Sequence, residues 1–456
     1  MPKYGVSAFK AYDIRGVVPD ELDAAIAYRI GRAFAQYVKA GRVVVGHDIR
    51  LSSPELSEAV MRGLAEGGVS DVVDIGMCGT EMIYFATPHF DADGGIMITA
   101  SHNPKQYNGM KFVRRGSVPI SGDTGLNDIR DLVAAADFAE ASDKDAWKSK
   151  VRREDVYADY AKHIASFLDL KSLKPLRIVC NAGNGIGGRM AEAIAKYLPF
   201  DLVKLNFTPD GNFPNGVPNP LLPENRDATS KAVVESHADL GVAWDGDSDR
   251  CFLFDEKGSF AEGYYIVGLL AKAFLSRDSH ARIIHDPRLT WNTIEIVKSM
   301  GGTPIMSKTG HAFIKERMRR EDAVYGGEMS AHHYFRDFFY CDSGMLPWLL
   351  VAEQICQSGK TLSSMLEESE RRYPVSGEIN SKVKDAAAVL RKVEDAYKGK
   401  ALSVDHTDGV SMDMGAWRFN VRMSNTEPVV RLNVESKGDK ALTDEKTKEL
   451  LALIRQ

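Results

Sequence analysis

Three carboxylates stand at alternate positions in the segment Asp245-Gly246-Asp247-Ser248-Asp249-Arg250. Alternate residues of an extended chain point to the same side, so these three side chains can converge on one point. Carboxylates that meet without a partner repel each other, and a hard divalent cation relieves that repulsion. Oxygen-only ligands suit Mg²⁺ or Ca²⁺, and a site with few protein ligands leaves room for water or a phosphoryl oxygen, as Mg²⁺ prefers. The segment therefore predicts a Mg²⁺ site with Asp245, Asp247 and Asp249 as ligands.

A calcium loop of the EF-hand type is one alternative, because the three aspartates and Glu256 would occupy loop positions one, three, five and twelve. Position six of such a loop needs a glycine for its turn, but Arg250 stands there. The flanking runs 240–244 and 251–254 predict strands, whereas an EF-hand loop lies between helices. A solvated acidic turn without a metal is the other alternative.

A serine stands on a tight turn in Thr99-Ala100-Ser101-His102-Asn103-Pro104, after the glycine pair Gly94-Gly95 and the apolar run Ile96-Met97-Ile98. The apolar run predicts a buried strand. Loops at the carboxyl ends of strands in α/β sheets are where ligands and chemistry collect. Ser101 is therefore a candidate nucleophile or phosphate carrier. A turn serine that bonds its own backbone is the alternative, and this segment alone favours that alternative.

The segment Arg422-Met423-Ser424-Asn425-Thr426-Glu427-Pro428 resembles a cradle for an anion, with a guanidinium, two hydroxyls, an amide and the backbone N–H groups of a turn. Arg431 follows closely. Arginine suits phosphate because its planar fork donates two parallel hydrogen bonds. A neutral capping loop is an equally good interpretation of this segment alone.

The segment Gly327-Glu328-Met329-Ser330-Ala331-His332-His333 places a carboxylate and a hydroxyl two residues apart. In an extended loop both can face one ligand, and Glu328 could accept hydrogen bonds from paired sugar hydroxyls. A polar surface turn is the alternative, and this segment alone favours it. We do not expect the two histidines to hold a metal together, because adjacent side chains of a strand point apart.

The glycine-rich segment Gly183-Asn184-Gly185-Ile186-Gly187-Gly188 formally contains G-x-G-x-x-G after a predicted strand. A dinucleotide site would need an acidic residue at the tip of the next strand. That strand, 202–205, is followed by Asn206. The segment therefore predicts a tight turn between a strand and a helix, without a bound nucleotide.

Strands that alternate with helices must position these loops. Pro54 stands where a helix would begin after the strand 43–45, and proline favours the first helical position. The pattern of a short apolar run followed by an amphipathic segment occurs in three successive blocks, which predicts a repeated α/β domain with parallel or mixed sheets. Strands are expected at 43–45, 72–75, 96–98, 177–180, 240–243 and 282–285, and helices at 191–198 and 293–300. The last block, from about residue 369, combines a helix at 386–397 with short strands such as 429–432, which predicts a smaller α+β domain.

The composition limits the class of protein. A chain of 456 residues with 44% hydrophobic and 27% charged residues predicts a soluble protein of several domains. The formal net charge of -5 favours neither nucleic acid nor membrane as a partner. The start of the chain lacks the apolar core of a signal peptide, and five scattered cysteines without a C-x-x-C pair indicate a reducing compartment. We therefore expect a cytoplasmic protein.

Four of these segments together resemble the α-D-phosphohexomutase family, and within it the bacterial phosphomannomutases. The four matching segments are Thr99–Pro104 (phosphoserine loop), Asp245–Arg250 (metal loop), Gly327–His333 (sugar loop) and Arg422–Thr426 (phosphate loop). They occur in the order and at the separations of the family, and residues 11–16, 107–111 and 209–220 match as well. The resemblance spans nearly the whole chain, and four motifs in register are specific.

The resemblance implies four domains around a central cleft. Three would be similar mixed α/β units, and the last would resemble the TATA-box-binding-protein fold. The expected ranges are 1–150 for the phosphoserine-loop domain, 151–255 for the metal-loop domain, 256–368 for the sugar-loop domain and 369–456 for the phosphate-binding domain. Ala331 stands where glycine is common in the family, which makes the geometry of the sugar loop a point to examine.

The resemblance also implies roles for individual residues. Ser101 would carry a phosphate and would bind Mg²⁺ together with the three aspartates. Lys111 and Arg15 would assist proton transfer and stabilise charge, with Arg250 beside them. The substrate would be contacted by Tyr12, Arg288, His311, Glu328, Ser330, His332, Arg422, Ser424, Asn425 and Thr426, of which the last four would hold the phosphate that is not reacting.

The implied reaction interconverts mannose 6-phosphate and mannose 1-phosphate through a 1,6-bisphosphate. One Mg²⁺ ion per chain, a hexose 1,6-bisphosphate activator and a monomer or weak homodimer are expected. Phosphoglucomutase or dual activity is the first alternative, since mannose and glucose differ only at the C2 hydroxyl. A phosphatase would not need a second phosphate cradle, and a sugar-phosphate-binding protein would not need Ser101 with the carboxylates.

Overall fold

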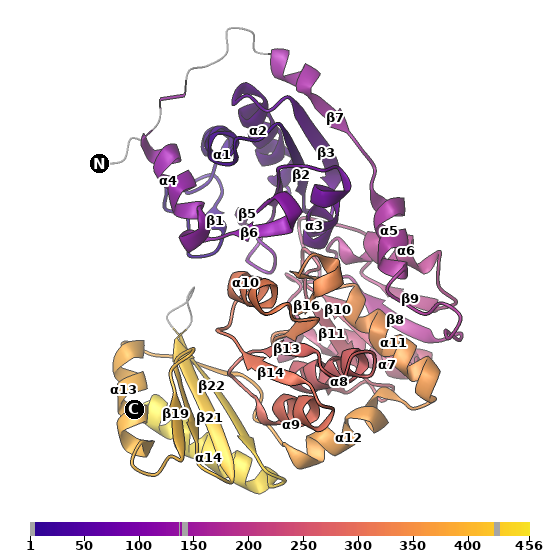
Figure 1. Cartoon of the computed structure of the whole chain (residues 1–456), viewed down its shortest axis with the longest axis vertical. Helices are drawn as coiled ribbons and strands as arrows, with labels where there is room; N and C mark the ends of the chain where they lie inside the picture. Colours follow the sequence, from indigo (N-terminus) through magenta and orange to yellow (C-terminus); the bar gives the residue numbers. More distant parts are fainter. Residues whose placement is uncertain (1–4, 136, 139–144, 424–428) are drawn as a thin grey trace. The chain divides into compact units, whose positions relative to one another are not determined.

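The computed structural model describes residues 5–135, 137–138, 145–423 and 429–456 (Figure 1). They form two compact units. The first unit comprises Met1–Phe260 and Asp337–Ser358, and the second comprises Ala261–Arg336 and Gly359–Gln456. Within the described ranges, no helix combines the length and the apolar character needed to cross a membrane.

The first sheet of the first unit runs in the order β1-β5-β4-β2-β3-β7, with β6 paired to β5. Strands β2, β3, β4 and β7 are parallel, and β5 is antiparallel to β4 and β1. Helices α1, α2 and α4 share one core with this sheet. The elements are β1 (Ile14–Val17), α1 (Ala24–Val38), β2 (Arg42–His47), α2 (Ser53–Glu66), β3 (Asp71–Met77), α3 (Thr80–His89), β4 (Gly94–Ile98), β5 (Tyr107–Arg114), β6 (Val118–Ile120), α4 (Leu126–Ala135) and β7 (Val151–Arg153).

The glycine pair at the start of β4 allows helices to approach both faces of this sheet. A Cβ atom on Gly94 would lie 2.7 Å from the ring of Phe34 on α1. A Cβ atom on Gly95 would lie 2.8 Å from Ile83 on α3. Because successive residues of a strand face opposite sides, α3 covers the face opposite to α1. The strand that ends next to Ser101 is therefore buried on both sides.

The second sheet runs in the order β12-β11-β10-β8-β9. Strands β8, β9 and β10 are parallel, and β10 and β11 form an antiparallel pair in which Trp244 is opposite Cys251. The acidic segment is therefore the tip of a β-hairpin, and the EF-hand alternative is excluded. The elements of this part of the first unit, of which β17 is not a strand of the second sheet, are α5 (Tyr157–Ala165), β8 (Arg177–Asn181), α6 (Gly187–Ala195), β9 (Asp201–Leu205), α7 (Asp227–Ser236), β10 (Leu240–Trp244), β11 (Cys251–Phe254), β12 (Phe260–Ala261), β17 (Cys341–Asp342) and α11 (Leu346–Ser358).

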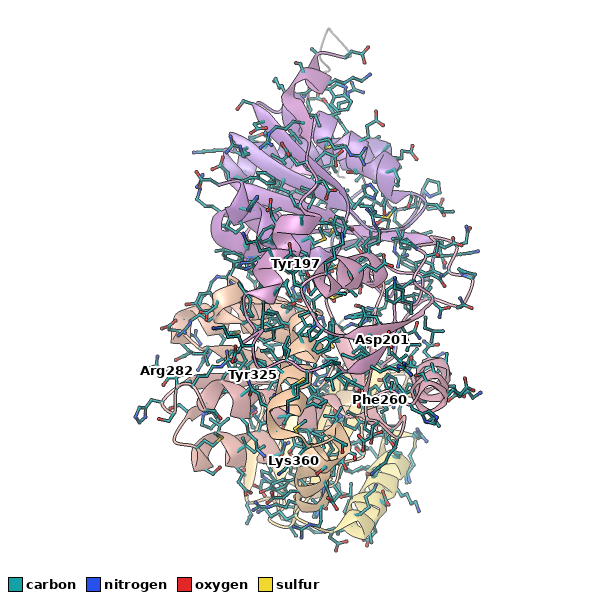
Figure 2. All side chains as sticks on the ribbon, turned by 90° about the vertical axis from the view of Figure 1, so that its right-hand side faces the viewer. Tyr197, Asp201, Phe260, Arg282, Tyr325 and Lys360 are labelled. Atoms are coloured by element: carbon teal, nitrogen blue, oxygen red, sulfur yellow. The ribbon has the colours of Figure 1, made fainter. Side chains whose placement is uncertain are left out.

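In the second unit, four neighbouring strands follow the order β14-β13-β15-β16, with β13 parallel to both β14 and β15. Arg282 and Tyr325, which begin β13 and β15, are labelled in Figure 2. The elements of this part are α8 (Gly263–Leu275), β13 (Arg282–His285), α9 (Trp291–Ser299), β14 (Thr303–Met306), α10 (His311–Glu321), β15 (Tyr325–Gly327), β16 (His333–Phe335) and α12 (Leu362–Arg372).

The last part of the chain forms an antiparallel sheet in the order β18-β22-β21-β20-β19, with α13 and α14 packed on it around one core. This is the smaller α+β domain expected from the sequence. Its elements are β18 (Ile379–Lys382), α13 (Ala386–Tyr397), β19 (Ser403–Asp405), β20 (Val410–Asp413), β21 (Trp417–Met423), β22 (Val429–Ser436) and α14 (Lys440–Ile454). Short 3-10 helices occur at Arg115–Ser117, Gly122–Thr124, Ala146–Lys150, Pro223–Asn225 and Arg336–Phe338.

The three α/β blocks repeat one arrangement, as the sequence pattern predicted. In each, a central strand (β2, β8 or β13) lies parallel to the strand that ends in a candidate loop (β4, β10 or β15). The phosphoserine loop, the metal loop and the sugar loop thus follow equivalent strands. Because the three blocks share this arrangement, the candidate functional residues follow the corresponding strand in each block.

The helix expected at 191–198 lies instead at Gly187–Ala195. Pro199 restricts the residue before it to extended conformations, which helps to end the helix before Leu198. The helix expected at 293–300 lies at Trp291–Ser299. A helix was predicted correctly in both places, and only its bounds differ.

The glycine-rich turn between β8 and α6 packs directly against the metal loop. A Cβ atom on Gly185 would lie 2.8 Å from the backbone oxygen of Gly246 and 3.1 Å from that of Ala182. Both obstacles are backbone atoms, which cannot rotate away. The turn was predicted from the sequence, but its role as a support for the metal loop follows only from this contact.

We predict that Gly185→Ala will lower stability by about 1–3 kcal/mol and weaken Mg²⁺ binding, because the added methyl group overpacks the backbone between Asp245 and Asp247. Thermal unfolding and calorimetric Mg²⁺ titration would measure the two effects. Gly399→Ala is the matched control, because a Cβ atom there meets nothing within 4 Å. Equal Mg²⁺ affinity in the Gly185→Ala variant and the parent protein would contradict the prediction.

Candidate functional site

Ser101 lies in the loop after β4, with its hydroxyl directed at the metal loop. Its Oγ atom donates a hydrogen bond of 2.7 Å to Asp245 Oδ2 and lies 3.0 Å from His102 Nδ1. Ser101 adopts a φ of 48°, in the left-handed region, and only 3% of its surface is exposed. The structure thus brings together Ser101 and Asp245, which are 144 residues apart in the sequence.

The three aspartates of the metal loop are buried and converge. One carboxylate oxygen from each of Asp245, Asp247 and Asp249 lies within 4.8 Å of the others. Asp247 Oδ1 is buried and has no hydrogen-bond partner among the described residues. Burial raises the pKa of Asp245, because a charged carboxylate is poorly solvated there, and the neighbouring aspartates add to the rise. A buried oxygen cluster with an unsatisfied carboxylate oxygen fits a hard divalent cation.

Basic side chains offset part of this negative charge. Lys111, on β5 beside β4, places Nζ 2.7 Å from Asp247 Oδ2 and 2.5 Å from Asp249 Oδ2. Burial opposes the charged form of Lys111, but the two carboxylates outweigh it and raise its pKa above the usual value. Arg250 Nε donates to Asp245 Oδ2 over 2.8 Å.

Arg15 reaches the phosphoserine loop from β1. Its Nη1 donates to Asn103 Oδ1 over 2.5 Å, and its Nε donates to Asp13 Oδ2 over 2.9 Å. Tyr12 lies half-buried in the segment just before β1. Arg15 and Tyr12 therefore lie at the same end of the first sheet as the loop of Ser101.

The sugar loop of the second unit is organised around Glu328. Its Oε2 accepts a hydrogen bond of 2.6 Å from the Tyr334 hydroxyl, and its Oε1 accepts one of 3.1 Å from the backbone N–H of Gly310. His332 Nδ1 lies 3.6 Å from the same carboxylate and 3.5 Å from Ser330 Oγ. The structure therefore groups Glu328, Ser330 and His332, and Gly310 precedes His311 at the start of α10.

Ala331 holds a φ of 70°, a left-handed conformation that costs a residue with a Cβ atom about 1–2 kcal/mol. Ala331 therefore adopts the left-handed conformation that a glycine would adopt at a lower cost. His333 points away from His332, because its Nδ1 lies 2.7 Å from the Tyr325 hydroxyl. Burial lowers the pKa of His333 to about 3, so this ring is neutral at ordinary pH.

Three arginines of the second unit converge on Glu378, which precedes β18. Arg288 Nη1 and Arg422 Nη2 lie 3.2 and 3.1 Å from Glu378 Oε2, and Arg431 Nη1 lies 3.5 Å from Oε1. The Glu378 side chain is only 5% exposed. Burial alone would raise its pKa, but the three guanidinium groups lower it to about 2.

Two N–H donors of this arginine cluster remain available. The Nε atoms of Arg288 and Arg422 are buried without a hydrogen-bond partner in the described part of the chain. Buried donors of this kind are costly unless a ligand satisfies them. The cluster can therefore bind an anion. Ser424, Asn425 and Thr426, which the sequence assigned to the same function, lie outside the described residues.

Four models of one family match the chain in succession, and together they cover most of it. Their descriptions are phosphoglucomutase/phosphomannomutase alpha/beta/alpha domain I at residues 6–140, domain II at 156–258, domain III at 262–373 and the C-terminal domain at 378–452. The chain belongs to the phosphoglucomutase/phosphomannomutase family. This is the α-D-phosphohexomutase family that the sequence motifs resemble.

Curated relatives of this phosphohexomutase match it over nearly the whole length. A protein of Escherichia coli K12 named phosphomannomutase is 56% identical, over 99% of either chain. A protein of Xanthomonas campestris named phosphohexose mutases is 57% identical, over 98% of this chain and 99% of its own. A crystal structure of a family protein from Burkholderia thailandensis has a TM-score of 0.86 at 34% identity, covering 98% of this chain and 97% of that one.

Several residues of this phosphohexomutase escaped the sequence analysis. Thr80, at the start of α3, donates a hydrogen bond of 2.5 Å from Oγ1 to Asp247 Oδ2. Asp48 and Arg50 hold the loop of Ser101 in place, and Glu378 holds the arginine cluster. One signal was present in the sequence: the pattern His-Asp-x-Arg occurs at both 47–50 and 285–288. Thr80 and Glu378 have no comparable local signal.

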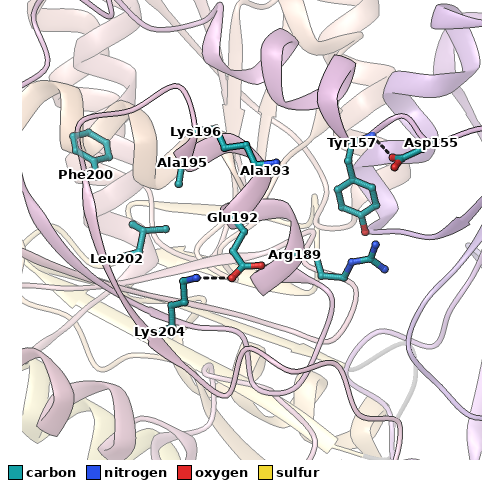
Figure 3. A pocket seen from close by; sticks show the side chains of 10 residues that line it. All are labelled: Asp155, Tyr157, Arg189, Glu192, Ala193, Ala195, Lys196, Phe200, Leu202 and Lys204. Atoms are coloured by element: carbon teal, nitrogen blue, oxygen red, sulfur yellow. Dashed lines mark hydrogen bonds and ion pairs between the residues drawn. The ribbon is translucent and has the colours of Figure 1, made fainter.

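A hollow of about 650 Å³ in the first unit lies beside α6 and β9 (Figure 3). Its polar side chains are partly paired with each other, since Lys204 Nζ lies 2.5 Å from Glu192 Oε1 and Arg189 stacks on Tyr157 at 4.8 Å. The residues predicted for the site are not among those that line it. We therefore assign the chemistry of this phosphohexomutase to the loops and not to the hollow.

We predict that Glu378→Gln will destabilise the protein by about 3 kcal/mol at pH 7, because three guanidinium groups lose their counter-ion. The folded-state pKa of Glu378 is depressed, so its contribution is present above the ordinary carboxyl pKa and disappears as the pH falls toward 2. Thermal unfolding of both proteins between pH 7 and pH 3 would measure this.

Sulfate provides a second arm of the same experiment. It should stabilise the Glu378→Gln variant more than the parent protein, because the anion replaces the missing charge between the arginines. Glu367→Gln, which removes the same charge from an exposed residue of α12, serves as a control for net charge. An equal shift by sulfate in variant and parent would contradict the assignment of an anion site.

Proposed function

We propose that this chain interconverts mannose 6-phosphate and mannose 1-phosphate through a phosphorylated Ser101 and a 1,6-bisphosphate. The observation that carries the proposal is the hydrogen bond of 2.7 Å from Ser101 Oγ to Asp245, at a buried cluster of three carboxylates. The names of relatives 56–57% identical over nearly the full length support the mannose substrate. The cytoplasm is the proposed compartment, supported by five buried free cysteines.

Mg²⁺ is the proposed metal, held by Asp245, Asp247, Asp249 and the Ser101 phosphate. Bound there, it would neutralise charge on the phosphoryl group during transfer. Lys111 shares two of the same carboxylates, and Arg250 is fixed against the third. These cations hold the loop together and add positive charge beside the reacting phosphate.

In the proposed transfer, a sugar hydroxyl oxygen forms a bond to phosphorus while the bond from phosphorus to Ser101 Oγ breaks. Over the step the hydroxyl proton passes from the sugar to Ser101 Oγ, and in the reverse step it passes from Ser101 Oγ to the departing sugar oxygen. Lys111 and Arg15 assist these proton movements by stabilising the charge that develops. Phosphoryl transfer depends mainly on positioning and electrostatics, which suits a rigid, buried set of charges.

The second unit supplies the proposed groups for the rest of the substrate. Glu328, Ser330 and His332 bind sugar hydroxyls, and Arg422 binds the phosphate that is not reacting. Tyr12, Arg288, His311, Ser424, Asn425 and Thr426 complete the proposed substrate contacts. Phosphate has nearly the same shape from every side, so arginine donors can accept it from either end of the sugar.

A phosphoglucomutase or dual activity is the second candidate, and a specific finding favours it. The matched models name both phosphoglucomutase and phosphomannomutase, and the Xanthomonas relative is named for hexose phosphates in general.

The rest of the proposal concerns the activator, the oligomeric state and the domains. The activator is a hexose 1,6-bisphosphate, and the protein is a monomer or weak homodimer. The domains span residues 1–150, 151–255, 256–368 and 369–456.

We predict that Ser101→Ala will lose the covalent phosphate and lower kcat on the order of 10³-fold or more, since no other hydroxyl replaces the carrier. Intact mass of the variant and of the parent, each after incubation with glucose 1,6-bisphosphate, would show the phosphate. Ser149→Ala, an exposed residue, is the control. A Ser101→Ala enzyme that turned over at the parent rate would disprove the carrier.

We predict a higher kcat/KM for mannose 1-phosphate than for glucose 1-phosphate, with Mg²⁺ and a trace of bisphosphate present. A site that hydrogen-bonds one C2 hydroxyl discriminates against the other orientation, because a buried polar group is left without a partner. Steady-state kinetics on the two substrates would measure the ratio. Equal values would favour the dual activity.

A further inference from the structure

Arg50 lies in the loop after β2 and is buried, with 1% of its surface exposed. Its guanidinium donates to four backbone carbonyls of the phosphoserine loop. The acceptors are Ser101 O at 2.8 Å, Asn103 O at 2.7 Å, Pro104 O at 2.9 Å and Tyr107 O at 2.9 Å. A single side chain therefore satisfies four of the seven carbonyl groups from Ser101 to Tyr107, where β5 begins.

Asp48 holds the other end of the same loop. Its Oδ2 accepts a hydrogen bond of 2.7 Å from Thr99 Oγ1, and Thr99 Oγ1 in turn accepts one of 2.9 Å from the backbone N–H of Ser101. Asp48 also accepts from the backbone N–H of Arg50 over 2.9 Å, and its Oδ2 lies 3.3 Å from Arg50 Nε. The two residues thus form one element that contacts the serine loop on both sides of Ser101.

The serine loop needs such support. Ser101 has a φ of 48°, which residues with a Cβ atom adopt only when the surroundings impose it. Arg50 is itself enclosed, because the Phe213 ring lies 5.4 Å from its guanidinium carbon and a Cβ atom on Gly211 would lie 2.5 Å from Ile49 O. Without Arg50, buried carbonyl groups would lose their donors, and the turn would relax toward ordinary conformations.

The same arrangement occurs a second time, in the third α/β block. Asp286 accepts from the backbone N–H of Arg288 over 2.9 Å and from that of Met329 over 2.9 Å. Arg288 Nη2 donates to Ser330 Oγ over 3.2 Å. The His-Asp-x-Arg segment after β13 thus positions the loop after β15, as the segment after β2 positions the loop after β4.

We propose that Asp48 and Arg50 are positioning residues that set the conformation of Ser101 for phosphoryl transfer. The proposal rests on the proposed function, because it concerns Ser101 as the phosphate carrier. Arg50 acts through the backbone of the loop. Its loss should therefore lower kcat and the rate of Ser101 phosphorylation. The KM should remain, because none of the groups proposed to bind the sugar or the distal phosphate is a hydrogen-bond partner of Arg50.

Arg50→Lys tests the proposal, because lysine keeps the charge but cannot reach four carbonyls with one planar fork. We expect kcat and the rate of Ser101 phosphorylation by glucose 1,6-bisphosphate to fall about 10²-fold, with KM within twofold of the parent value. Arg29→Lys is the matched control, because Arg29 is buried and donates to the backbone oxygen of Val133 through Nε and Nη2, far along the chain from the serine loop.

Arg50→Ala with added guanidinium chloride at millimolar concentration is the second variant. Recovery of kcat by guanidinium, and not by ammonium of equal ionic strength, would support the role, since a merely destabilised fold would not be rescued. A parent-like kcat in Arg50→Lys, a loss of kcat matched by Arg29→Lys, or an Arg50→Ala variant without rescue would overturn it. The proposed function fails separately, if the parent enzyme takes no phosphate on Ser101 from the bisphosphate.

Discussion

The burial of three carboxylates at one point is the constraint on which the rest of the first unit depends. Asp245 and Asp247 are fully buried and Asp249 nearly so. Moving several like charges out of water costs many kcal/mol unless opposite charges and hydrogen bonds compensate. Lys111 and Arg250 supply charges, and Thr80 and Ser101 supply hydroxyl donors. These partners come from β5, the residue before β11, α3 and the loop after β4, so one cluster connects the first two sheets of the unit.

The second unit shows the opposite electrostatic problem. Arg288, Arg422 and Arg431 would repel each other without Glu378, whose pKa of about 2 reflects how strongly the three cations favour its charged form. Other carboxylates share the positive charge, since Asp286 lies 2.7 Å from Arg288 and Asp408 lies 3.9 Å from Arg422. The Nε donors of Arg288 and Arg422 still lack a partner among the described residues, so the cluster can bind an anion. The acidic cluster thus suits a cation and the arginine cluster suits an anion, as the proposed phosphoryl transfer requires.

The sequence predicted best what local pattern determines. Alternation at 245–249 indicated convergence, the flanking apolar runs indicated strands, and the helix at 386–397 was predicted with its observed bounds. Glu378 could not be predicted, because its arginine partners at 288 and 422 lie 90 and 44 residues away. Arg50 escaped for a different reason. Its partners are backbone carbonyls, which leave no trace in residue types, and only the recurrence of His-Asp-x-Arg at 285–288 hinted at a common use.

The second α/β block lacks the His-Asp-x-Arg segment that the first and third blocks contain. After β8, the positions of the aspartate and arginine are taken by Asn181 and Gly183, and Asn181 Oδ1 still accepts from the backbone N–H of Gly183 over 3.0 Å. The hydrogen bond from side chain to backbone is therefore the same, but the arginine is absent, and Gly183 adopts a φ of 55° that neither Arg50 nor Arg288 adopts. The turn after β8 packs against the metal loop at Gly246, and a Cβ atom on Gly246 would itself lie 2.5 Å from Ser101 O. The turn after β8, the metal loop and the loop of Ser101 thus pack against one another through their backbones, which leaves no room for a side chain at Gly185 or Gly246. A Cβ atom on Gly183 would lie 2.4 Å from the Cβ atom of Pro218, so the glycine at the arginine position serves the packing of this turn.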